Sequence, residues 1–186
     1  MNFILPPIPK VYSYRRVSGP RQIWGTGLKR QEDGVIAVEA VSKEYGLPVD
    51  DTLSLVDRGL SGFTGANLSD TAALGMYLKM VENSEIARGS ILCIEALDRL
   101  TRDEVPEALH LFLSIQRNGV RIYTWGDKKL YSWEGMAAEP TLLIVSIVIL
   151  MRANNESVQK GQRIRTVTAQ PGARMDWPCR VAQMAR

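Results

Sequence analysis

The apolar residues of the chain recur in two patterns that alternate along its length. Short apolar runs rich in β-branched and aromatic residues predict four strands and a weaker fifth, over residues 11–17, 53–56, 91–97, 120–124 and 129–133. Apolar residues three or four positions apart predict helices over residues 27–45, 70–83, 103–118 and 139–165, and Ser69 or Asp70 is expected to cap the second. This alternation indicates an α/β fold, in which a mostly parallel sheet of four or five strands has helices on both faces.

One segment of the last predicted helix, Leu142–Met151, is apolar on every side. It is about half as long as the ~20 residues that a membrane-spanning helix needs, so we expect no membrane partner. A single small domain can cover only part of such a helix, and the remainder would exceed the apolar patch that a monomer usually tolerates. We therefore expect self-association through this segment, with a buried strand as the alternative.

The length and composition fit one domain with a short tail. The chain has 186 residues, and 45% of them are hydrophobic, which is enough for a substantial core. Residues 166–186 have no regular period and contain Pro171 and Pro178, so they predict an irregular tail. The net charge of +3 and the pI of about 8.9 lean mildly toward anionic partners. The first residues lack the basic leader of a signal peptide, and we expect a cytoplasmic protein.

Cysteine and histidine are too few for several common kinds of site. Cys93 and Cys179 lie far apart, and Cys93 stands in an apolar run that predicts a buried thiol. His110 is the only histidine, and its leucine-rich helical stretch places it on a helix surface. The sequence therefore argues against a zinc site and against a histidine-based catalytic triad.

Candidate chemistry begins where the first strand ends. Ser18 follows that strand, and Arg15, Arg16 and Arg21 flank it. Open α/β sheets bind ligands at the carboxyl ends of their strands, and guanidinium groups match phosphate oxygens two at a time. The stretch therefore indicates a phosphate site, with a polar turn and surface arginines as the alternative.

Polar residues also follow the second and third predicted strands. Asp57 comes after the second, and Asp98, Arg99 and Arg102 come after the third. Because parallel strands end at one edge of a sheet, we expect these residues to form one site with Ser18. The third cluster has another interpretation on its own, since Asp98 and Arg102 are spaced for a surface ion pair across one helical turn.

These three segments together resemble the catalytic domain of the serine recombinases, the resolvase and invertase family. The segments are YRRVSGPRQ with GTGLKRQ, then VDRGLSGFTGANL, and then IEALDRLTRD. The resemblance covers roughly residues 11–165 and is greatest for integrase-type and phage-type members. It implies a three-layer, resolvase-like α/β domain over residues 1–165, with a long C-terminal helix from about 140 to 165 and the tail over 166–186.

The resemblance also implies a reaction with double-stranded DNA that needs no metal or other cofactor. In such enzymes a serine cleaves DNA, forms a 5′-phosphoserine link and is released when the strands are rejoined, and homodimers pair into tetramers. The positions that match the family's catalytic residues are Ser18 as the nucleophile, Arg16, Gln22, Asp57, Asp98, Arg99 and Arg102. Tyr14 matches an aromatic residue common just before the first of these arginines.

Elementary chemistry agrees with these implied roles. A serine hydroxyl is a weak nucleophile at neutral pH and needs a group that accepts its proton. Without a suitable histidine, either Asp98 or the field of the arginines must fill that role, and the sequence leaves both open. Arg16, Arg99 and Arg102 are suited to stabilise the negative charge of a phosphoryl transition state in place of a metal ion.

Two features depart from the family pattern. Many relatives have an arginine in the loop after the second strand, whereas TGANLSDTAA has none; Asn67 stands near that place, and Arg58 is the nearest substitute. Relatives also continue into a DNA-binding domain, for which the residues after Arg165 are too few. We therefore expect a catalytic domain without its sequence reader, as an expression fragment, a natural truncation or a frameshifted remnant.

Two functions from different classes stay open at this point. The first is a site-specific DNA recombinase. The second is a truncated, inactive homologue that dimerises with an intact recombinase and modulates it. A third and weaker interpretation is a flavodoxin-like receiver or nucleotide-binding domain, but the sequence lacks a glycine-rich loop that would hold phosphates at the start of a helix.

Overall fold

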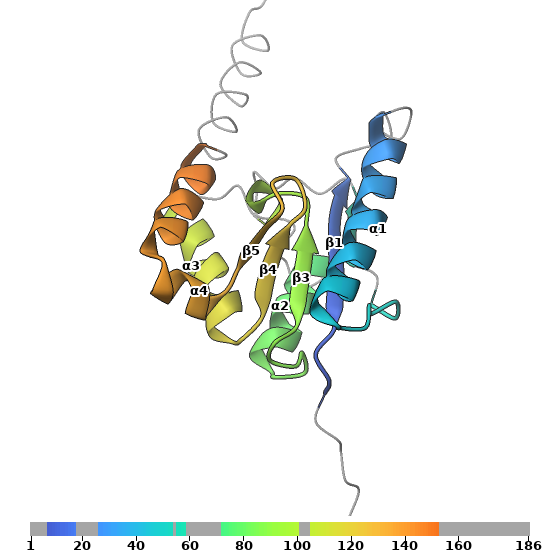
Figure 1. Ribbon diagram of the computed structural model, residues 1–186, viewed down its shortest axis with the longest axis horizontal. Helices are drawn as coiled ribbons and strands as arrows, with labels where there is room; N and C mark the ends of the chain where they lie inside the picture. Colours follow the sequence, from blue (N-terminus) through green and yellow to red (C-terminus); the bar gives the residue numbers. More distant parts are fainter. Residues whose placement is uncertain (1–6, 18–25, 54, 59–71, 101–104, 153–186) are drawn as a thin grey trace, which may run out of the picture.

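The computed structural model describes residues 7–17, 26–53, 55–58, 72–100 and 105–152 (Figure 1). In chain order, the strands are β1 (Val11–Val17), β2 (Leu55–Arg58), β3 (Ile91–Ile94), β4 (Arg121–Thr124) and β5 (Lys129–Tyr131). The helices are α1 (Thr26–Tyr45), α2 (Ala73–Glu82), the 3₁₀ helix η3 (Leu97–Arg99), α3 (Val105–Arg117) and α4 (Trp133–Ala138). A further helix covers residues 140–152 and follows α4 directly.

The five strands form one sheet in the order β2-β1-β3-β4-β5. β1 lies between β2 and β3 and is parallel to both, and β4 is parallel to β3. Among these strands only β5 runs antiparallel, as the partner of β4. The predicted, mostly parallel sheet is therefore confirmed, and its parallel strands end at the same edge.

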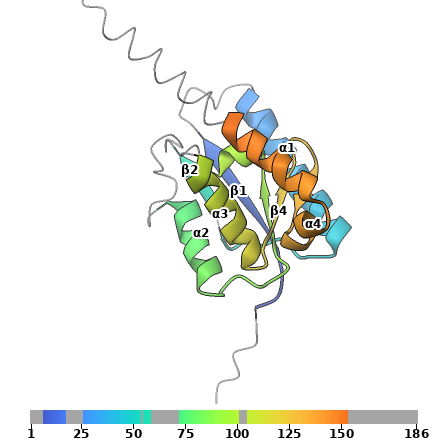
Figure 2. The ribbon, with the colours of Figure 1, turned by 90° about the vertical axis from the view of Figure 1, so that its left-hand side faces the viewer.

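Helices cover both faces of this sheet (Figures 1 and 2). α1 packs on one face, where Val38 and Val41 meet Val11 of β1 together with Ile91 and Cys93 of β3. α2 and α3 lie on the other face, as the second view makes clear. The predicted three-layer α/β arrangement is confirmed.

The larger core lies on the face covered by α2 and α3. Tyr12 and Tyr14 of β1 pack there with Leu74 and Tyr77 of α2 and with Phe112 of α3. The ring centroids of Tyr12 and Tyr77 are 5.3 Å apart. Val11 and Tyr12 of β1 thus pack into cores on opposite faces of the sheet, because successive side chains of a strand point to opposite faces.

The second and third strands differ from their predicted bounds. β2 begins at Leu55 rather than residue 53, because the preceding chain forms a turn around Asp50. The backbone N–H groups of Thr52 and Leu53 both donate hydrogen bonds to Asp50 Oδ1, at 3.1 and 2.9 Å. A side chain that binds nearby backbone groups in this way competes with strand pairing. β3 ends at Ile94 rather than residue 97, since the chain turns into η3.

The start of α2 also differs from the prediction. Its N-cap is Ala72 rather than Ser69 or Asp70, both of which lie outside the described residues. The side chain of Ala72 cannot accept a hydrogen bond from the first helical turn. Another residue supplies the cap: the Asp57 carboxylate accepts hydrogen bonds from the backbone N–H groups of Ala73 and Leu74.

The chain after β5 contains a helix that the sequence does not predict. β5 stops at Tyr131, and the Ser132 hydroxyl oxygen accepts a hydrogen bond from the Gly135 N–H at 3.0 Å, which caps α4. The predicted strand over residues 129–133 is therefore too long. With only six residues, α4 is too short to show a helical period in the sequence.

The helix over residues 140–152 is covered by its own domain on one side only. Ser146 and Leu150 are buried, at 0% and 2% exposure. Ile144, Val148 and Met151 are exposed to 61%, 57% and 46%. None of the helices that the structure describes is long and apolar enough to cross a membrane. The remainder of the predicted helix and the predicted tail lie outside the described residues.

Candidate active site

The carboxyl ends of β1, β2 and β3 bring polar side chains to one edge of the sheet. Arg16 of β1 is in register with Asp57 of β2, and Tyr14 is in register with Leu55. Tyr14 and Arg16 are two positions apart on one strand, so both side chains project from the face of the larger core. β1 thus carries a phenol and a guanidinium to the same region, just before Ser18 in the chain.

The carboxylate of Asp57 joins three elements and is buried, with 3% of the residue exposed. Its Oδ2 accepts a hydrogen bond from the Tyr14 hydroxyl at 3.1 Å. Its Oδ1 accepts one from the Ala73 N–H at 2.8 Å, and Oδ2 accepts a weaker one from the Leu74 N–H at 3.4 Å. These N–H groups belong to the first turn of α2, so Asp57 supplies the cap that Ala72 lacks. Asp57 therefore fixes β1, β2 and α2 relative to one another.

Arg16 and Asp98 connect the ends of β1 and β3. Arg16 Nη2 donates a long hydrogen bond, 3.5 Å, to the backbone carbonyl of Asp98. Asp98 is the middle residue of η3, which follows β3 closely, and both residues are partly buried. The first and third sequence clusters therefore meet in the structure through these two residues.

Arg99 lies between two carboxylates. Its Nε–H donates a hydrogen bond to Glu95 Oε2 at 2.8 Å, and its Nη1 lies 3.6 Å from Asp98 Oδ2. The side chain is 18% exposed. Burial alone would lower the pKa of Arg99, but the Asp98 and Glu95 carboxylates raise that pKa above its ordinary value. Arg99 therefore stays charged, and its guanidinium has a fixed orientation.

The predicted catalytic residues that the structure describes form two sets of contacts, and β1 contributes a residue to each. Tyr14 binds Asp57, Arg16 binds Asp98, and Asp98 lies against Arg99. The Tyr14 phenol also raises the pKa of Arg99, although less than the carboxylates do. The other candidates lie outside the residues whose side chains are described: Ser18, Gln22, Arg58, Asn67 and Arg102.

Glu95 is a residue of this site that the sequence analysis missed. It stands between β3 and η3, and it makes the direct hydrogen bond to Arg99. A signal existed, because a glutamate four residues before an arginine is a familiar spacing for an ion pair. That spacing brings side chains together in a helix and not in a strand. Because the predicted third strand extends through residue 97, the sequence does not predict the ion pair between Glu95 and Arg99.

The described residues do not favour a metal site or a histidine- or cysteine-based reaction. Among them, no group of three or more His, Cys, Asp and Glu residues is placed to hold a metal ion. His110 lies on the exposed side of α3. Cys93 is buried as predicted, and burial raises the pKa of its thiol to about 12. The thiol is therefore protonated at neutral pH and is a poor nucleophile.

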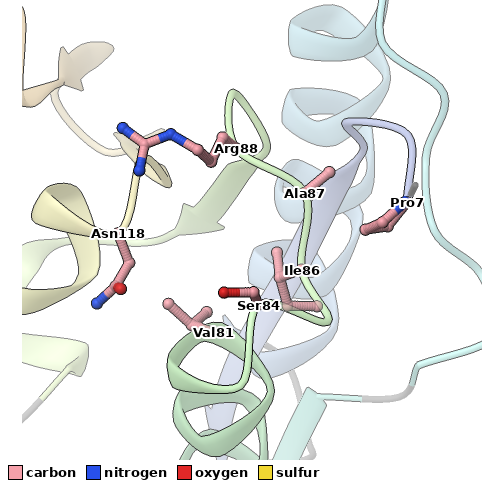
Figure 3. Close-up of a pocket in the computed structure, with 7 residues that line it drawn as sticks. All are labelled: Pro7, Val81, Ser84, Ile86, Ala87, Arg88 and Asn118. Carbon is pink, nitrogen blue, oxygen red and sulfur yellow. The ribbon is translucent and has the colours of Figure 1, made fainter.

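A separate depression lies away from this site, at the amino edge of the sheet (Figure 3). Its volume is about 380 Å³, and its lining comes from segments that precede β1, β3 and β4 rather than follow them. The lining residues are Pro7, Val81, Ser84, Ile86, Ala87, Arg88 and Asn118. It shares no residue with the group around Arg16 and Arg99.

Two known proteins are similar to this chain over most of its length. A protein of Escherichia coli (strain K12), described as uncharacterized protein YbcK, is 35% identical over 156 residues. This match covers 84% of the present chain and 30% of YbcK, so the chain spans less than a third of the length of that relative. The solved N-terminal catalytic domain of TP901-1 integrase is similar with a TM-score of 0.48 at 20% identity, over 81% of this chain and 97% of that one.

A family model identifies the chain directly. The model described as the N-terminal domain of resolvases matches residues 11–170, which is most of the chain. The matched region includes every described residue of the group at the carboxyl edge of the sheet. The protein therefore belongs to the resolvase N-terminal domain family, the catalytic domain of the serine recombinases.

Proposed function

We propose that the protein is the catalytic domain of a site-specific DNA recombinase, in which Ser18 cleaves and rejoins double-stranded DNA through a 5′-phosphoserine intermediate. The contact of Arg16 with Asp98, which in turn lies against Arg99, carries this proposal. It brings two guanidinium groups to the edge of the sheet where β1 ends, directly before Ser18 in the chain. Such groups bind a phosphate through pairs of hydrogen bonds, and membership of the family supports DNA as the source of that phosphate.

In the proposed cleavage step, Ser18 Oγ attacks the phosphorus of a DNA phosphodiester. The bond between Oγ and phosphorus forms while the bond between phosphorus and the 3′ oxygen breaks, and the 3′ oxygen leaves as a hydroxyl after taking up a proton. Asp98 is our candidate for the group that accepts the Ser18 proton, because its carboxylate lies beside Arg99 at this edge of the sheet and is partly exposed. Arg16 and Arg99, with Arg102, stabilise the charge of the transition state.

Rejoining reverses this chemistry. The 3′ hydroxyl of a DNA strand attacks the phosphoserine phosphorus, and Ser18 Oγ leaves and recovers its proton. Each step exchanges one phosphate ester for another, so the reaction needs no nucleotide cofactor.

Asp57 has a supporting role in this proposal. Its carboxylate is buried and already accepts hydrogen bonds from Tyr14, Ala73 and Leu74. A carboxylate in that position has little capacity to contact DNA. We assign Asp57 to holding the end of β1 against α2, which fixes the strand that leads to Ser18.

The active form is proposed to be a homodimer that pairs into a tetramer on DNA. The exposed residues Ile144, Val148 and Met151 are spaced four and three apart, so they form an apolar stripe along the helix over residues 140–152. A second copy of the chain can cover this stripe with its own. The pairing of two dimers into a tetramer is proposed from family membership and not from the described contacts.

The test is a search for the covalent adduct. The purified chain is incubated with a pool of random-sequence DNA duplexes and denatured, and protein joined to DNA is separated on a gel. After nuclease and trypsin digestion, mass spectrometry should find the nucleotide remnant on the peptide over residues 17–21. Ser18→Ala should abolish the adduct, whereas Ser114→Ala, on a half-buried helical serine of α3, should not. An adduct of unchanged yield in Ser18→Ala would rule out this nucleophile.

One observation favours the second candidate function, an inactive homologue that modulates an intact recombinase. Residues 59–71 contain no arginine, although many family members have one in that loop. The same adduct assay separates the two functions. A modulator forms no adduct itself but changes the adduct yield of an intact serine recombinase on the DNA site of that enzyme, whereas a recombinase forms its own.

A further inference from the structure

We infer that Glu95 is a positioning residue for Arg99, and that it holds the Arg99 guanidinium in the orientation in which that group binds a DNA phosphate. The inference rests on the proposed function, because the phosphate belongs to the DNA substrate. Glu95 lies between β3 and η3, and its Oε2 accepts the Arg99 Nε–H at 2.8 Å.

The position of this hydrogen bond on the guanidinium determines its effect. The guanidinium is planar and carries five N–H donors: the Nε–H lies on one edge beside an Nη–H, and two further Nη–H donors point outward from the end of the group. When Nε–H binds Glu95, the plane of the group is fixed and the donors at the outer Nη end are directed away from Glu95. Nη1 is 3.6 Å from Asp98 Oδ2, which is beyond hydrogen-bonding distance. The Nη edge is thus the edge that is suited to a phosphate.

The backbone of Glu95 is itself fixed by the turn between β4 and β5. Trp125 N–H donates a hydrogen bond to the Ile94 carbonyl at 3.0 Å, and Gly126 N–H donates one to the Glu95 carbonyl at 2.9 Å. A Cβ atom on Gly126 would lie 2.7 Å from the Glu95 carbonyl oxygen, so only glycine allows this approach. The turn therefore sets where the Glu95 carboxylate can reach.

The alternative is an ordinary ion pair that contributes only to stability. The Arg99 and Glu95 side chains are 18% and 28% exposed, and pairs with this access to solvent contribute little to folding. The two roles differ in what they require of Glu95. Stability of an ion pair depends mainly on charge, whereas orientation of the guanidinium depends on the length of the side chain and on an acceptor oxygen.

Two variants separate length from charge. Glu95→Asp keeps the charge but is shorter by one methylene group, so it cannot reach Nε from the same backbone. Glu95→Gln keeps the length and an acceptor oxygen but has no charge. The positioning role predicts that the adduct yield falls about a hundredfold in Glu95→Asp, as expected for a misplaced catalytic group, and only about threefold in Glu95→Gln. Glu39→Gln, on an exposed mid-helix residue of α1, is the matched control and should have no effect.

A second measurement reports on Arg99 without DNA cleavage. The Nε–H signal of Arg99 is assigned in the NMR spectrum of the full chain by comparison with Arg99→Lys, and dimethyl phosphate is then titrated. Glu95→Asp should speed hydrogen exchange of this Nε–H and weaken dimethyl phosphate binding, while Glu95→Gln should nearly preserve both. Simple electrostatics predicts instead that Glu95→Gln binds dimethyl phosphate more tightly than the wild type does, because loss of the Glu95 charge removes a repulsion of the anion, and that Glu95→Asp, which keeps the charge, binds it as the wild type does.

The outcomes decide the inference separately from the proposed function. A greater defect in Glu95→Asp than in Glu95→Gln, in folded variants, supports positioning. The reverse order, or wild-type yield in both, overturns it. If the wild-type chain forms no adduct, the proposed recombinase function fails and the titration alone decides. The inference is then overturned if dimethyl phosphate leaves the Arg99 signal unchanged, or if Glu95→Asp binds it as well as the wild type does.

Discussion

The Tyr14 hydroxyl donates a hydrogen bond to Asp57 Oδ2 at 3.1 Å, and both residues are almost completely buried, at 1% and 3% exposure. This bond joins the strand that leads to Ser18 with the carboxylate that caps α2. The two residues lie 43 positions apart in the chain. A change at either one therefore affects both the stability of the domain and the geometry of the candidate site.

Asp57→Ala should destabilise the domain more than Tyr14→Phe does. Tyr14→Phe removes one hydrogen bond to a charged acceptor, and we expect the free energy of unfolding to fall by about 1–2 kcal/mol. Asp57→Ala also removes the cap of α2 and leaves the buried Tyr14 hydroxyl without this acceptor, so we expect a fall of about 3 kcal/mol. Urea unfolding measures both, with the exposed Asp51→Asn as a control near zero. A greater loss in Tyr14→Phe would contradict the assignment.

The sequence was informative where structure follows from local pattern. The β-branched and aromatic residues Val11, Tyr12 and Tyr14 predicted strand β1, and the alternation of strands with helical periods predicted the layered fold. The cap of α2 was beyond this reasoning, because it joins Asp57 to Ala73 across 16 positions and depends on how β2 and α2 pack.

The candidate site likewise combines contacts that the sequence predicts with a contact that depends on the three-dimensional path of the chain. The convergence of Arg16 and Asp98 followed from the rule that parallel strands end at one edge, and the structure brings them into contact. Glu95 was missed because its partnership with Arg99 depends on the chain turning into η3 after β3. The role of Ser18 came from family resemblance, and it stays a prediction.

Acid should weaken the fold through Asp50. Its carboxylate binds Lys10 Nζ at 2.7 Å and the backbone N–H groups of Thr52 and Leu53. Burial would raise the pKa of Asp50, but these hydrogen bonds outweigh it and hold that pKa below the ordinary value of 3.8. A carboxyl whose pKa is lower in the folded state stabilises the fold above its unfolded pKa, and this contribution is lost as the pH falls through the folded pKa.

Asp50→Asn tests this acid dependence. The variant should be less stable than the wild type at pH 7, and the difference should shrink as the pH falls below about 4, where the wild-type carboxylate becomes protonated. Urea unfolding at a series of pH values measures the free energy of unfolding for both proteins. A difference that stays constant down to strongly acidic pH would show that Asp50 acts through packing and not through its charge.

Arg16→Lys should impair adduct formation although it preserves the positive charge. Lysine has a point charge on a flexible stem, without the planar pair of donors that binds two phosphate oxygens or the reach to the Asp98 carbonyl. We expect the yield of covalent protein–DNA adduct to fall about a hundredfold, as for the loss of one transition-state donor. Arg117→Lys, on an exposed arginine at the end of α3, should leave the yield unchanged. Equal yields for both variants would show that Arg16 contributes charge alone.

The two sides of the helix over residues 140–152 have different partners. Leu150 is 2% exposed and packs against the larger core of its own domain, so this residue is unavailable to a second copy. Ile144 and Val148 are more than half exposed on the same helix. The structure therefore places the apolar surface available for association at Ile144, Val148 and Met151, although the sequence alone marks Leu150 just as strongly.

Charged residues at this stripe should convert a dimer to a monomer. Ile144→Glu with Val148→Glu puts two carboxylates on a surface that must lose its water on association, while the exposed positions leave the core intact. Sedimentation velocity should show a monomer for this variant and a dimer for the wild type. Leu150→Ala is the matched control, because it should lower the free energy of unfolding by about 2–5 kcal/mol and still sediment as a dimer below its unfolding temperature. A wild-type chain that sediments as a monomer at several hundred micromolar would show that the stripe does not bind a second copy.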